Sequence, residues 1–282
     1  MYIKSPLNYT GGKYKILSSL MNKFPNKINT FVDLFAGGFN VGINIDANNI
    51  ICNDHITYLI DLYKYFQNTQ IEVLISEINK RIDEFSLNLE NSEGYNNLRE
   101  RYNIYNDIMD LFVLTCYSFN HQIRFNNNHK FNTPFGKARS RYNKNIENNL
   151  CRFCSALKEK KIQFFNCDFL EIDLSLLKSN DLVYCDPPYL ISTGVYNDGK
   201  RGFKDWTDTE ETQLLNLLDN LDTNNTKFAL SNVFYHKGLS NDKLIDWSKK
   251  YNVYYINKDY SNCNYHLKDK TSKTLEVLIT NF

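Results

Sequence analysis

The segment Asp186-Pro187-Pro188-Tyr189 carries the most specific chemical signal in the sequence. Proline fixes φ and lacks a backbone donor, so two consecutive prolines make a rigid ledge that offers a carboxylate, carbonyl oxygens and an aromatic ring. Acceptors beside a stacking surface suit an exocyclic amino group on a planar ring. We therefore expect Asp186 and the Pro187 carbonyl to accept the two N–H groups of such an amine while Tyr189 stacks on its ring. Taken alone, the segment could also be a turn with an ordinary aspartate.

Three further groups of candidate residues follow short apolar runs that predict strands. Gly37-Gly38 follows the run 30–34, Asp54 follows 50–52, and Asp168-Phe169 follows 162–165. In an open α/β sheet, ligands bind beyond the carboxyl ends of the strands. These residues and Asp186 are therefore expected to line one crevice.

The glycine turn and Asp54 favour a nucleoside as the ligand. A carboxylate at this distance from a glycine turn suits hydrogen bonds to ribose hydroxyls. The turn departs from the dinucleotide-binding pattern, because Phe39 stands where the second glycine of that pattern would be. A nucleoside without phosphates, such as S-adenosyl-L-methionine, needs only close approach of the backbone. It is therefore the expected ligand.

The order of the predicted elements indicates an α/β fold with a Rossmann-like, mostly parallel sheet. The run 30–34, a glycine turn and a helix from Asn40 are expected to form a βαβ unit with the strand at 50–52. A strand at 182–185 precedes the proline ledge, and a helix capped by Thr207 or Asp208 follows it.

The C-terminal part of the chain predicts the other edge of the sheet. A strand at 227–230 is expected to end at Ser231-Asn232, and two more strands are expected at 253–256 and 275–280. Because no convincing helix lies between the last two, they predict an antiparallel pair at the edge of the sheet.

The middle of the chain differs from both flanks. Residues 56–117 have the apolar spacing of amphipathic helices, whereas 118–145 is rich in Asn and predicts a hairpin or a long loop. The formal net charge of the whole chain is only +1, but residues 111–146 contain six Lys and Arg residues and no Asp or Glu. This stretch could dock a phosphate backbone, and from charge alone a solvated basic loop explains it equally well.

Composition excludes several classes of protein. The chain has 282 residues, of which 42% are hydrophobic and 23% charged, so a disordered or fibrous protein is not expected. No apolar run approaches the roughly 20 residues of a membrane-spanning helix, and the first residues lack a secretory signal, so a cytoplasmic location is expected. Seven cysteines indicate reduced thiols, and the isolated pair Cys151 and Cys154 does not predict a metal site.

Together these motifs resemble the D12-class, or α-group, DNA N6-adenine methyltransferases, which include the Dam enzymes. The resemblance covers nearly the whole chain and rests on seven elements in the family's order. They are Pro6 to Lys13, Asp33 to Gly38, Asp54, Asp168-Phe169, Asp186 to Tyr189, Ser231-Asn232, and a hairpin formed by residues 119–126 and 131–136. Phe39 stands where the last glycine of the family's first turn is usual.

The resemblance implies a site for S-adenosyl-L-methionine. Tyr9 and Lys13 would contact this methyl donor, Phe35 and Gly37 would form the pocket wall, Asp54 would hold the ribose, and Asp168 with Phe169 would bind its adenine. Asp186 would touch both the donor and the target base, and no metal is expected in the reaction. The catalytic residues would be Asp186, Pro187 and Tyr189.

The resemblance also implies DNA contacts in the hairpin and near the N-terminus. Phe119 would wedge into the opened duplex, Arg124 would read a guanine through a bidentate contact, and Gln122 and Pro134 would lie near the next bases. The full expected set is Asn8, Phe119, Asn120, Gln122, Arg124, Asn126, Pro134, Lys137 and Arg139. Asn8 replaces a lysine common in Dam enzymes, and the hairpin is closer to those of type IIS methyltransferases.

The implied activity is methyl transfer to N6 of a flipped-out adenine in double-stranded DNA, at GATC or a related GA-containing site. The enzyme would act as a monomer in a restriction-modification or Dam-like system, in the former case beside a cognate endonuclease encoded elsewhere. Residues 1–55 and 151–282 would form the catalytic domain and 56–150 the target-recognition domain. An RNA or protein-amide methyltransferase is the alternative, although many of these have Asn in place of Asp186. A catalytically inactive DNA-binding module would need a damaged pocket, and the pocket motifs are intact.

Overall fold

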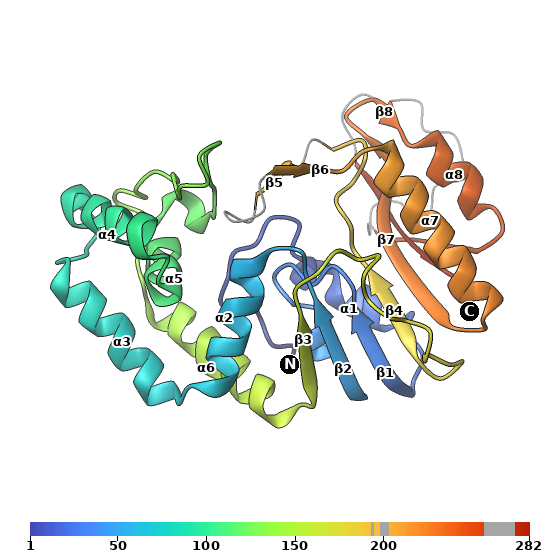
Figure 1. Ribbon diagram of the computed structural model, residues 1–282, viewed down its shortest axis with the longest axis horizontal. Coiled ribbons are helices and arrows are strands. Elements are labelled where there is room, and N and C mark those ends of the chain that lie inside the picture. Colours follow the sequence, from blue (N-terminus) through green and yellow to red (C-terminus); the bar gives the residue numbers. More distant parts are fainter. Residues whose placement is uncertain (193–194, 198–202, 257–273) are drawn as a thin grey trace.

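The computed structural model describes residues 1–192, 195–197, 203–256 and 274–282 of the chain (Figure 1). Its centre is a sheet with the strand order β3-β2-β1-β4-β7-β10-β9, and β8 pairs with β7. The strands are β1 (Ile28–Asp33), β2 (Ala47–Asn53), β3 (Ile162–Phe165), β4 (Leu182–Cys185), β7 (Lys227–His236), β8 (Leu239–Ser240), β9 (Asn252–Tyr255) and β10 (Leu275–Thr280).

The pairing of these strands confirms the predicted α/β fold with its Rossmann-like, mostly parallel sheet. Strands β3, β2, β1, β4 and β7 are parallel to one another, in that order. Strand β10 is antiparallel to both β7 and β9, which gives the expected antiparallel pair at the C-terminal edge. Because β10 runs the opposite way, its first residues lie at the edge where β4 and β7 have their carboxyl ends.

Helices cover both faces of the sheet (Figure 1). Alternation along the strands directs Phe31 and Tyr184 to one face and Val32 and Val183 to the other, and each set lies in a separate buried apolar cluster. The first cluster includes α1 (Leu17–Met21), α2 (Thr57–Asn68) and α6 (Lys144–Glu159), and the second includes α7 (Asp208–Thr223) and α8 (Asp242–Ser248). Thr207 caps α7 through a capping box with Glu210, as expected.

The expected helix from Asn40 is wrong. The connection from β1 to β2 contains only a short 3-10 turn, η2 (Gly42–Asn44). The side chains of Asn40 and Asn44 bind backbone groups of the N-terminal segment: Asn40 Oδ1 accepts from Ser5 N at 3.0 Å, and Asn44 Oδ1 accepts from Ile3 N at 2.7 Å. These contacts fix the connection against the N-terminal segment instead of leaving it to form a helix.

The expected end of a strand at Ser231-Asn232 is also wrong, because β7 continues through both residues to His236. Both side chains are buried and have partners inside the protein. Ser231 Oγ lies 2.9 Å from the hydroxyl of Tyr184, and Asn232 Nδ2 donates to Glu211 Oε1 at 3.4 Å. Since the polar groups are satisfied without water, the strand can stay buried.

The middle of the chain forms the predicted helices, of which α2 packs on the sheet and the other three extend away from it at the left of Figure 1. They are α2, α3 (Ile71–Glu84), α4 (Ser92–Tyr105) and α5 (Ile108–Tyr117). The buried carboxylate of Asp110 on α5 accepts from Arg81 Nε at 2.6 Å and from Arg101 Nε at 2.7 Å, which joins three helices through one residue. Among the described residues, no helix is long and apolar enough to span a membrane.

The segment after α5 begins with the 3-10 turn η3 (Phe119–His121) and forms an irregular hairpin. Only two isolated antiparallel bridges join its arms, Ser118 with Phe135 and Phe125 with Phe131. The rings of Phe125 and Phe131 are buried and cross at 85° with centroids 5.8 Å apart. The prediction of a hairpin or long loop is thus confirmed, and an aromatic contact anchors it. Helix α6 then runs through residue 150 back to β3.

Candidate active site

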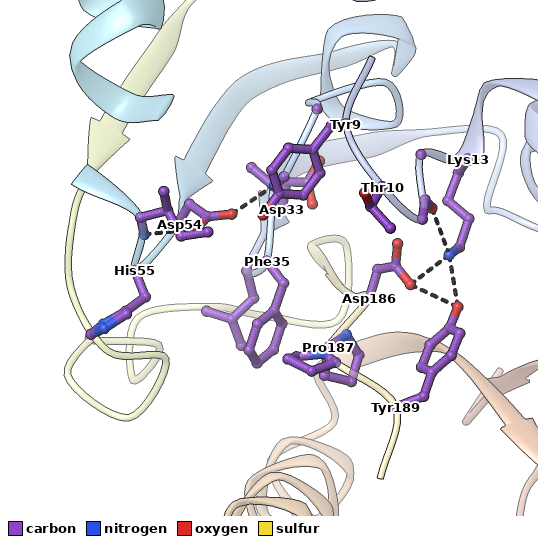
Figure 2. Close-up of a pocket in the computed structure, with 18 of the residues that line it drawn as sticks. Tyr9, Thr10, Lys13, Asp33, Phe35, Asp54, His55, Asp186, Pro187 and Tyr189 are labelled. Atoms are coloured by element: carbon purple, nitrogen blue, oxygen red, sulfur yellow. Dashed lines mark hydrogen bonds and ion pairs between the residues drawn. The ribbon is translucent and has the colours of Figure 1, made fainter. Parts of the chain in front are cut away.

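A pocket of about 420 Å³ lies at the carboxyl ends of β1, β2 and β4, as the strand-end residues predicted. The turn η1 (Lys13–Ile16) and the loop before it close one side. The strands β5 (Val195–Asn197) and β6 (Phe203–Asp205) pair with each other, and Trp206, directly after β6, also lines the pocket. Figure 2 shows Asp54 and His55 at one end, Phe35 in the middle, and Lys13, Asp186 and Tyr189 at the other end. The pocket is lined by all eight residues expected to bind the donor.

The glycine turn is held by Asp54. One carboxylate oxygen, Oδ2, accepts from Gly37 N at 2.7 Å, and the other accepts from Ile56 N at 2.8 Å. Burial raises the pKa of Asp54 to about 6, against the lowering effect of these two hydrogen bonds. Asp54 therefore shapes the turn as well as lining the pocket.

Gly37 is required at its position for two reasons. Its φ of +49° lies in the left-handed region, and a Cβ atom there would lie 3.0 Å from Cε1 of the Tyr9 ring. The pocket wall thus depends on close contact between the backbone of Gly37 and Tyr9.

An aromatic cage forms the middle of the pocket. Phe35 and Phe169, both expected from the sequence, have ring centroids 5.3 Å apart. Trp206 completes the cage, 5.6 Å from Phe35 at 80° and 5.7 Å from Phe169 at 43°. The motifs of the sequence do not predict Trp206, because it follows no strand of the main sheet; its only signal is its place directly before the Thr207 cap.

Asp33, at the end of β1, presents a buried polar atom without a protein partner. Its Oδ2 accepts from Gly42 N at 3.0 Å, whereas its Oδ1 has no hydrogen-bond partner in the described structure. Burial raises the pKa of this carboxyl group to about 8. A ligand that brings a positive charge or an N–H donor would therefore be stabilised here.

Four charged or polar side chains meet at the proline ledge. The ammonium group of Lys13 lies 2.8 Å from Asp186 Oδ1, 2.7 Å from the hydroxyl of Tyr189 and 3.4 Å from Glu276 Oε1. The Tyr189 hydroxyl also donates to Asp186 Oδ1 at 3.1 Å. Figure 2 shows the contacts of Lys13 with Asp186 and Tyr189. The sequence does not predict Glu276 as a site residue, because it lies near the start of β10 and not after the carboxyl end of a strand.

The charged groups of this cluster shift one another's pKa values. Burial by itself would lower the pKa of Lys13, but Asp186 and Glu276 raise it overall, so Lys13 stays protonated. Burial raises the pKa of Asp186, the charge of Glu276 raises it further, and Lys13 opposes both effects. The described contacts of the Lys13 ammonium are with this cluster and with the carbonyl of Gly11, rather than with the aromatic cage.

The hairpin residues expected to bind DNA are largely exposed. Gln122, Arg124, Pro134, Lys137 and Arg139 are all exposed, and Phe119 is 40% exposed with the Arg139 guanidinium 4.9 Å from its ring centre. Arg124 Nε donates to Asn132 Oδ1 at 3.2 Å, which orients the guanidinium. Asn126 instead stabilises a turn, because its Oδ1 accepts from the backbone of Asn128 and Lys130.

One hydrogen bond joins the hairpin to the pocket. Asn8 Nδ2 donates to the carbonyl of Asn120 at 2.9 Å, across 112 residues of sequence. Asn8 directly precedes Tyr9, which lines the pocket, and Asn120 directly follows the exposed Phe119. Both Asn120 and His121 have left-handed backbone angles, with φ of 54° and 55°. The two loops expected to hold the donor and the duplex therefore lie side by side.

Possible metal ligands do not gather in the described part of the chain. No group of three or more His, Cys, Asp and Glu side chains with suitable geometry occurs among residues 1–192, 195–197, 203–256 and 274–282.

Comparison with known proteins gives consistent results. The family model for D12 class N6 adenine-specific DNA methyltransferases matches residues 9–262. The chain is 50% identical over 281 residues to the type II methyltransferase M.FokI of Planomicrobium okeanokoites, and 48% identical over 283 residues to the modification methylase StsI of Streptococcus sanguinis. Each match covers 100% of this chain but 43% of the relative, so the chain spans less than half the length of these two proteins. A DNA adenine methylase of Salmonella typhi is 27% identical over 238 residues, covering 80% of this chain and 79% of that protein.

Proposed function

Because the chain belongs to the D12 class N6 adenine-specific DNA methyltransferases, we propose that it transfers a methyl group from S-adenosyl-L-methionine to N6 of a flipped-out adenine in a short double-stranded DNA sequence. The observation that carries the proposal is that the ledge Asp186 to Tyr189 lines the same pocket as the Asp54-held glycine turn. A site suited to a nucleoside and a group of acceptors suited to an amino group thus lie in one pocket.

The pocket residues fit the methyl donor. The cavity volume lies in the usual range for small-molecule sites, and its aromatic cage of Phe35, Phe169 and Trp206 suits a planar adenine. The unpartnered Oδ1 of Asp33 suits the donor's ammonium group, and Asp54 suits the ribose. When bound, S-adenosyl-L-methionine supplies an electrophilic methyl group on a sulfonium ion.

The protein's part in the reaction is positioning and electrostatic stabilisation. Adenine N6 inside a duplex is out of reach, so the base must leave the stack, at a cost of a few kcal/mol that stacking on Tyr189 offsets in part. Asp186 and the Pro187 carbonyl then accept the N6 hydrogens, which orients the nitrogen lone pair toward the methyl carbon. Transfer of the methyl group from sulfur to N6 would release S-adenosyl-L-homocysteine and leave positive charge on N6, which the carboxylate of Asp186 would stabilise until the extra N6 proton passed to solvent.

We place target recognition in residues 56–150, with the hairpin in contact with the DNA and residues 1–55 and 151–282 forming the catalytic domain. Exposed Arg124 and Gln122, with Phe119 beside them, support this assignment. The proposed target is GATC or a related GA-containing site, methylated by a monomer. Two of the relatives are named as modification methylases and others as DNA adenine methylases, so both a restriction-modification and a Dam-like context are compatible with the chain.

Expression in a bacterial host that lacks DNA methylation tests the proposal. Sequencing of modified bases should find N6-methyladenine at one short sequence in DNA from cells expressing the wild-type chain. The Asp186→Ala variant should give none while retaining most of its affinity for DNA, because the exposed hairpin residues expected to contact the DNA are unchanged. Absence of N6-methyladenine with the wild-type chain would contradict the proposal, and methyl groups on RNA or protein alone would favour the alternative activity.

A further inference from the structure

We propose that Glu276 is a positioning residue of the methyl-transfer reaction: it shares the Lys13 ammonium with Asp186, so that Lys13 neutralises the Asp186 carboxylate less and this carboxylate can stabilise the amino group of the target base. The inference rests on the proposed function. It assigns a role to a residue at the start of β10, far in sequence from the proline ledge.

The geometry places Glu276 in direct contact with the catalytic cluster. Its Oε1 lies 3.4 Å from Lys13 Nζ and 3.4 Å from the hydroxyl of Tyr189. The side chains of Asp186 and Glu276 are each 19% exposed, and that of Lys13 is 6% exposed. In surroundings this poor in water, charges interact more strongly than they do at the surface.

The fold explains why Glu276 reaches this place. Alternation along β10 puts Glu276 on the same face of the sheet as Leu278, the face that also carries Tyr184. Because β10 is antiparallel to β7, its first residues lie at the edge from which the ledge departs. A register irregularity between Leu275 and Glu276 falls at this point of the pairing with β7.

The Lys13 ammonium has more acceptors than it has N–H groups. Three donors face four oxygens: the Gly11 carbonyl at 3.1 Å, the Tyr189 hydroxyl, Asp186 Oδ1 and Glu276 Oε1. The two carboxylates therefore compete for the same donor. A small movement of the ammonium toward Glu276 would weaken its contact with Asp186 without leaving Lys13 unpaired.

The competition between the two carboxylates affects the reaction through the net charge of the cluster. A single ammonium 2.8 Å from Asp186 would neutralise that carboxylate just where positive charge develops on N6. The second carboxylate leaves the cluster with an excess of one negative charge. Without Glu276 the cluster would be neutral, and Asp186 would stabilise the transition state less.

Single-turnover methylation of unmethylated plasmid DNA, with enzyme in excess over DNA, tests the role. Glu276→Gln keeps the shape of the side chain and removes its charge, so we expect the rate to fall at least tenfold. The affinity for S-adenosyl-L-homocysteine, measured by calorimetry, and the melting temperature should stay near those of the wild type. Glu276→Asp should restore part of the rate. Glu159→Gln, at the exposed end of helix α6, is the control for loss of a glutamate charge outside the pocket and should leave the rate unchanged.

The pH profile separates this role from a structural one. Asp186 is faced by Lys13 from η1, Glu276 from β10 and Tyr189 from its own segment, with Asp33 on β1 coupled to it more weakly. Because the charge of Glu276 raises the pKa of Asp186, its removal should lower that pKa, and the acid limb of the rate profile should move to lower pH.

The double variant Lys13→Gln with Glu276→Gln adds a second test. It keeps the excess of one negative charge, so it should be faster than Glu276→Gln alone. The inference is overturned if Glu276→Gln has the wild-type rate. It is also overturned if the lower rate of this variant is accompanied by an equal loss of donor affinity or by a lower melting temperature, and the acid limb of the rate profile does not shift. An inactive wild-type chain would instead overturn the proposed function, and this inference with it.

Discussion

The indole Nε1 of Trp206 donates a hydrogen bond to Oε2 of Glu211 at 2.7 Å. Glu211 is fully buried, and its other oxygen accepts from the side-chain amides of Asn241, at 3.0 Å, and Asn232, at 3.4 Å. Every one of these partners is a donor, so only a carboxylate can satisfy them all. A buried charge on α7 thus orients one wall of the proposed donor site.

Trp206→Ala should weaken binding of the methyl donor about tenfold, as the loss of ~1.5 kcal/mol of aromatic stacking implies. The chain contains two tryptophans, and Trp247 lies on α8 with its Nε1 bonded to Asp219. In the Trp247→Phe variant, Trp206 becomes the sole tryptophan, and its fluorescence should change when S-adenosyl-L-homocysteine is added. If calorimetry shows that the Trp247→Phe variant binds the ligand but its fluorescence does not change, Trp206 does not form part of the donor site.

Glu211→Gln should loosen the same wall. An amide places an NH₂ group against at least one donor, which costs about 1–3 kcal/mol for a buried unsatisfied pair. We expect a lower melting temperature together with weaker donor binding. Asp219→Asn, which disturbs the bond to the remote Trp247, should lower only the melting temperature. Equal donor affinities in both variants would show that Glu211 does not orient the pocket.

Gly37→Ala should reduce donor affinity at least tenfold, because the new Cβ would crowd the Tyr9 ring as well as strain the backbone. Gly238→Ala is the matched control, since Gly238 also has a positive φ, +84°, but has nothing within 4 Å of the added Cβ. Both variants should lose about 1 kcal/mol of stability through backbone strain. Only Gly37→Ala should bind S-adenosyl-L-homocysteine weakly. Equal binding by both variants would show that Tyr9 is not part of the donor site.

Asp33→Asn should change how stability depends on pH. The pKa of Asp33 is raised by burial from 3.8 to about 8, so between these values the folded chain keeps a proton that the unfolded chain releases. The free energy of unfolding of the wild type should therefore fall as pH rises from about 4 to 8, by up to ~1.4 kcal/mol per pH unit from this group.

Urea unfolding at several pH values measures this effect. The difference between Asp33→Asn and the wild type should grow with pH in favour of the variant, since an amide has no proton to lose. Asp83→Asn, at an exposed position of α3, should run parallel to the wild type. A wild-type curve parallel to that of Asp33→Asn would mean that Asp33 is ionised in the folded protein.

Arg124→Ala and Lys137→Ala should separate sequence reading from backbone binding. Arg124 is exposed and its guanidinium is oriented by Asn132, so its loss should cost about 1–3 kcal/mol at the methylated sequence and little on other DNA. Lys137 is exposed, with only a 3.5 Å contact to Glu90, and its loss should weaken binding to all sequences and reduce the salt slope by about 0.9. Titrations at several salt concentrations measure both effects, and equal losses on all DNA for Arg124→Ala would exclude base reading.

The local pattern of the sequence determined the strands of the sheet and the pocket residues that follow them. Apolar runs that end in Gly37, Asp54, Asp168 and Asp186 predicted the strands and the crevice, because the carboxyl ends of parallel strands meet at one edge. The helical spacing of residues 56–117 predicted the helices for a similar reason, since side-chain periodicity is a local property.

Tertiary structure alone decided the rest. Phe39 takes the left-handed angle usual for glycine, with φ of 54°, while its ring is buried against Tyr63 and Phe153, and no local propensity predicts a Phe there. Glu276 joins Lys13 across 263 positions of sequence only because β10 runs antiparallel, and Asn8 meets Asn120 only because two loops pack together. The sequence names the groups that could do chemistry, but the distances between groups on different elements arise from packing, which has no sequence period to reveal it.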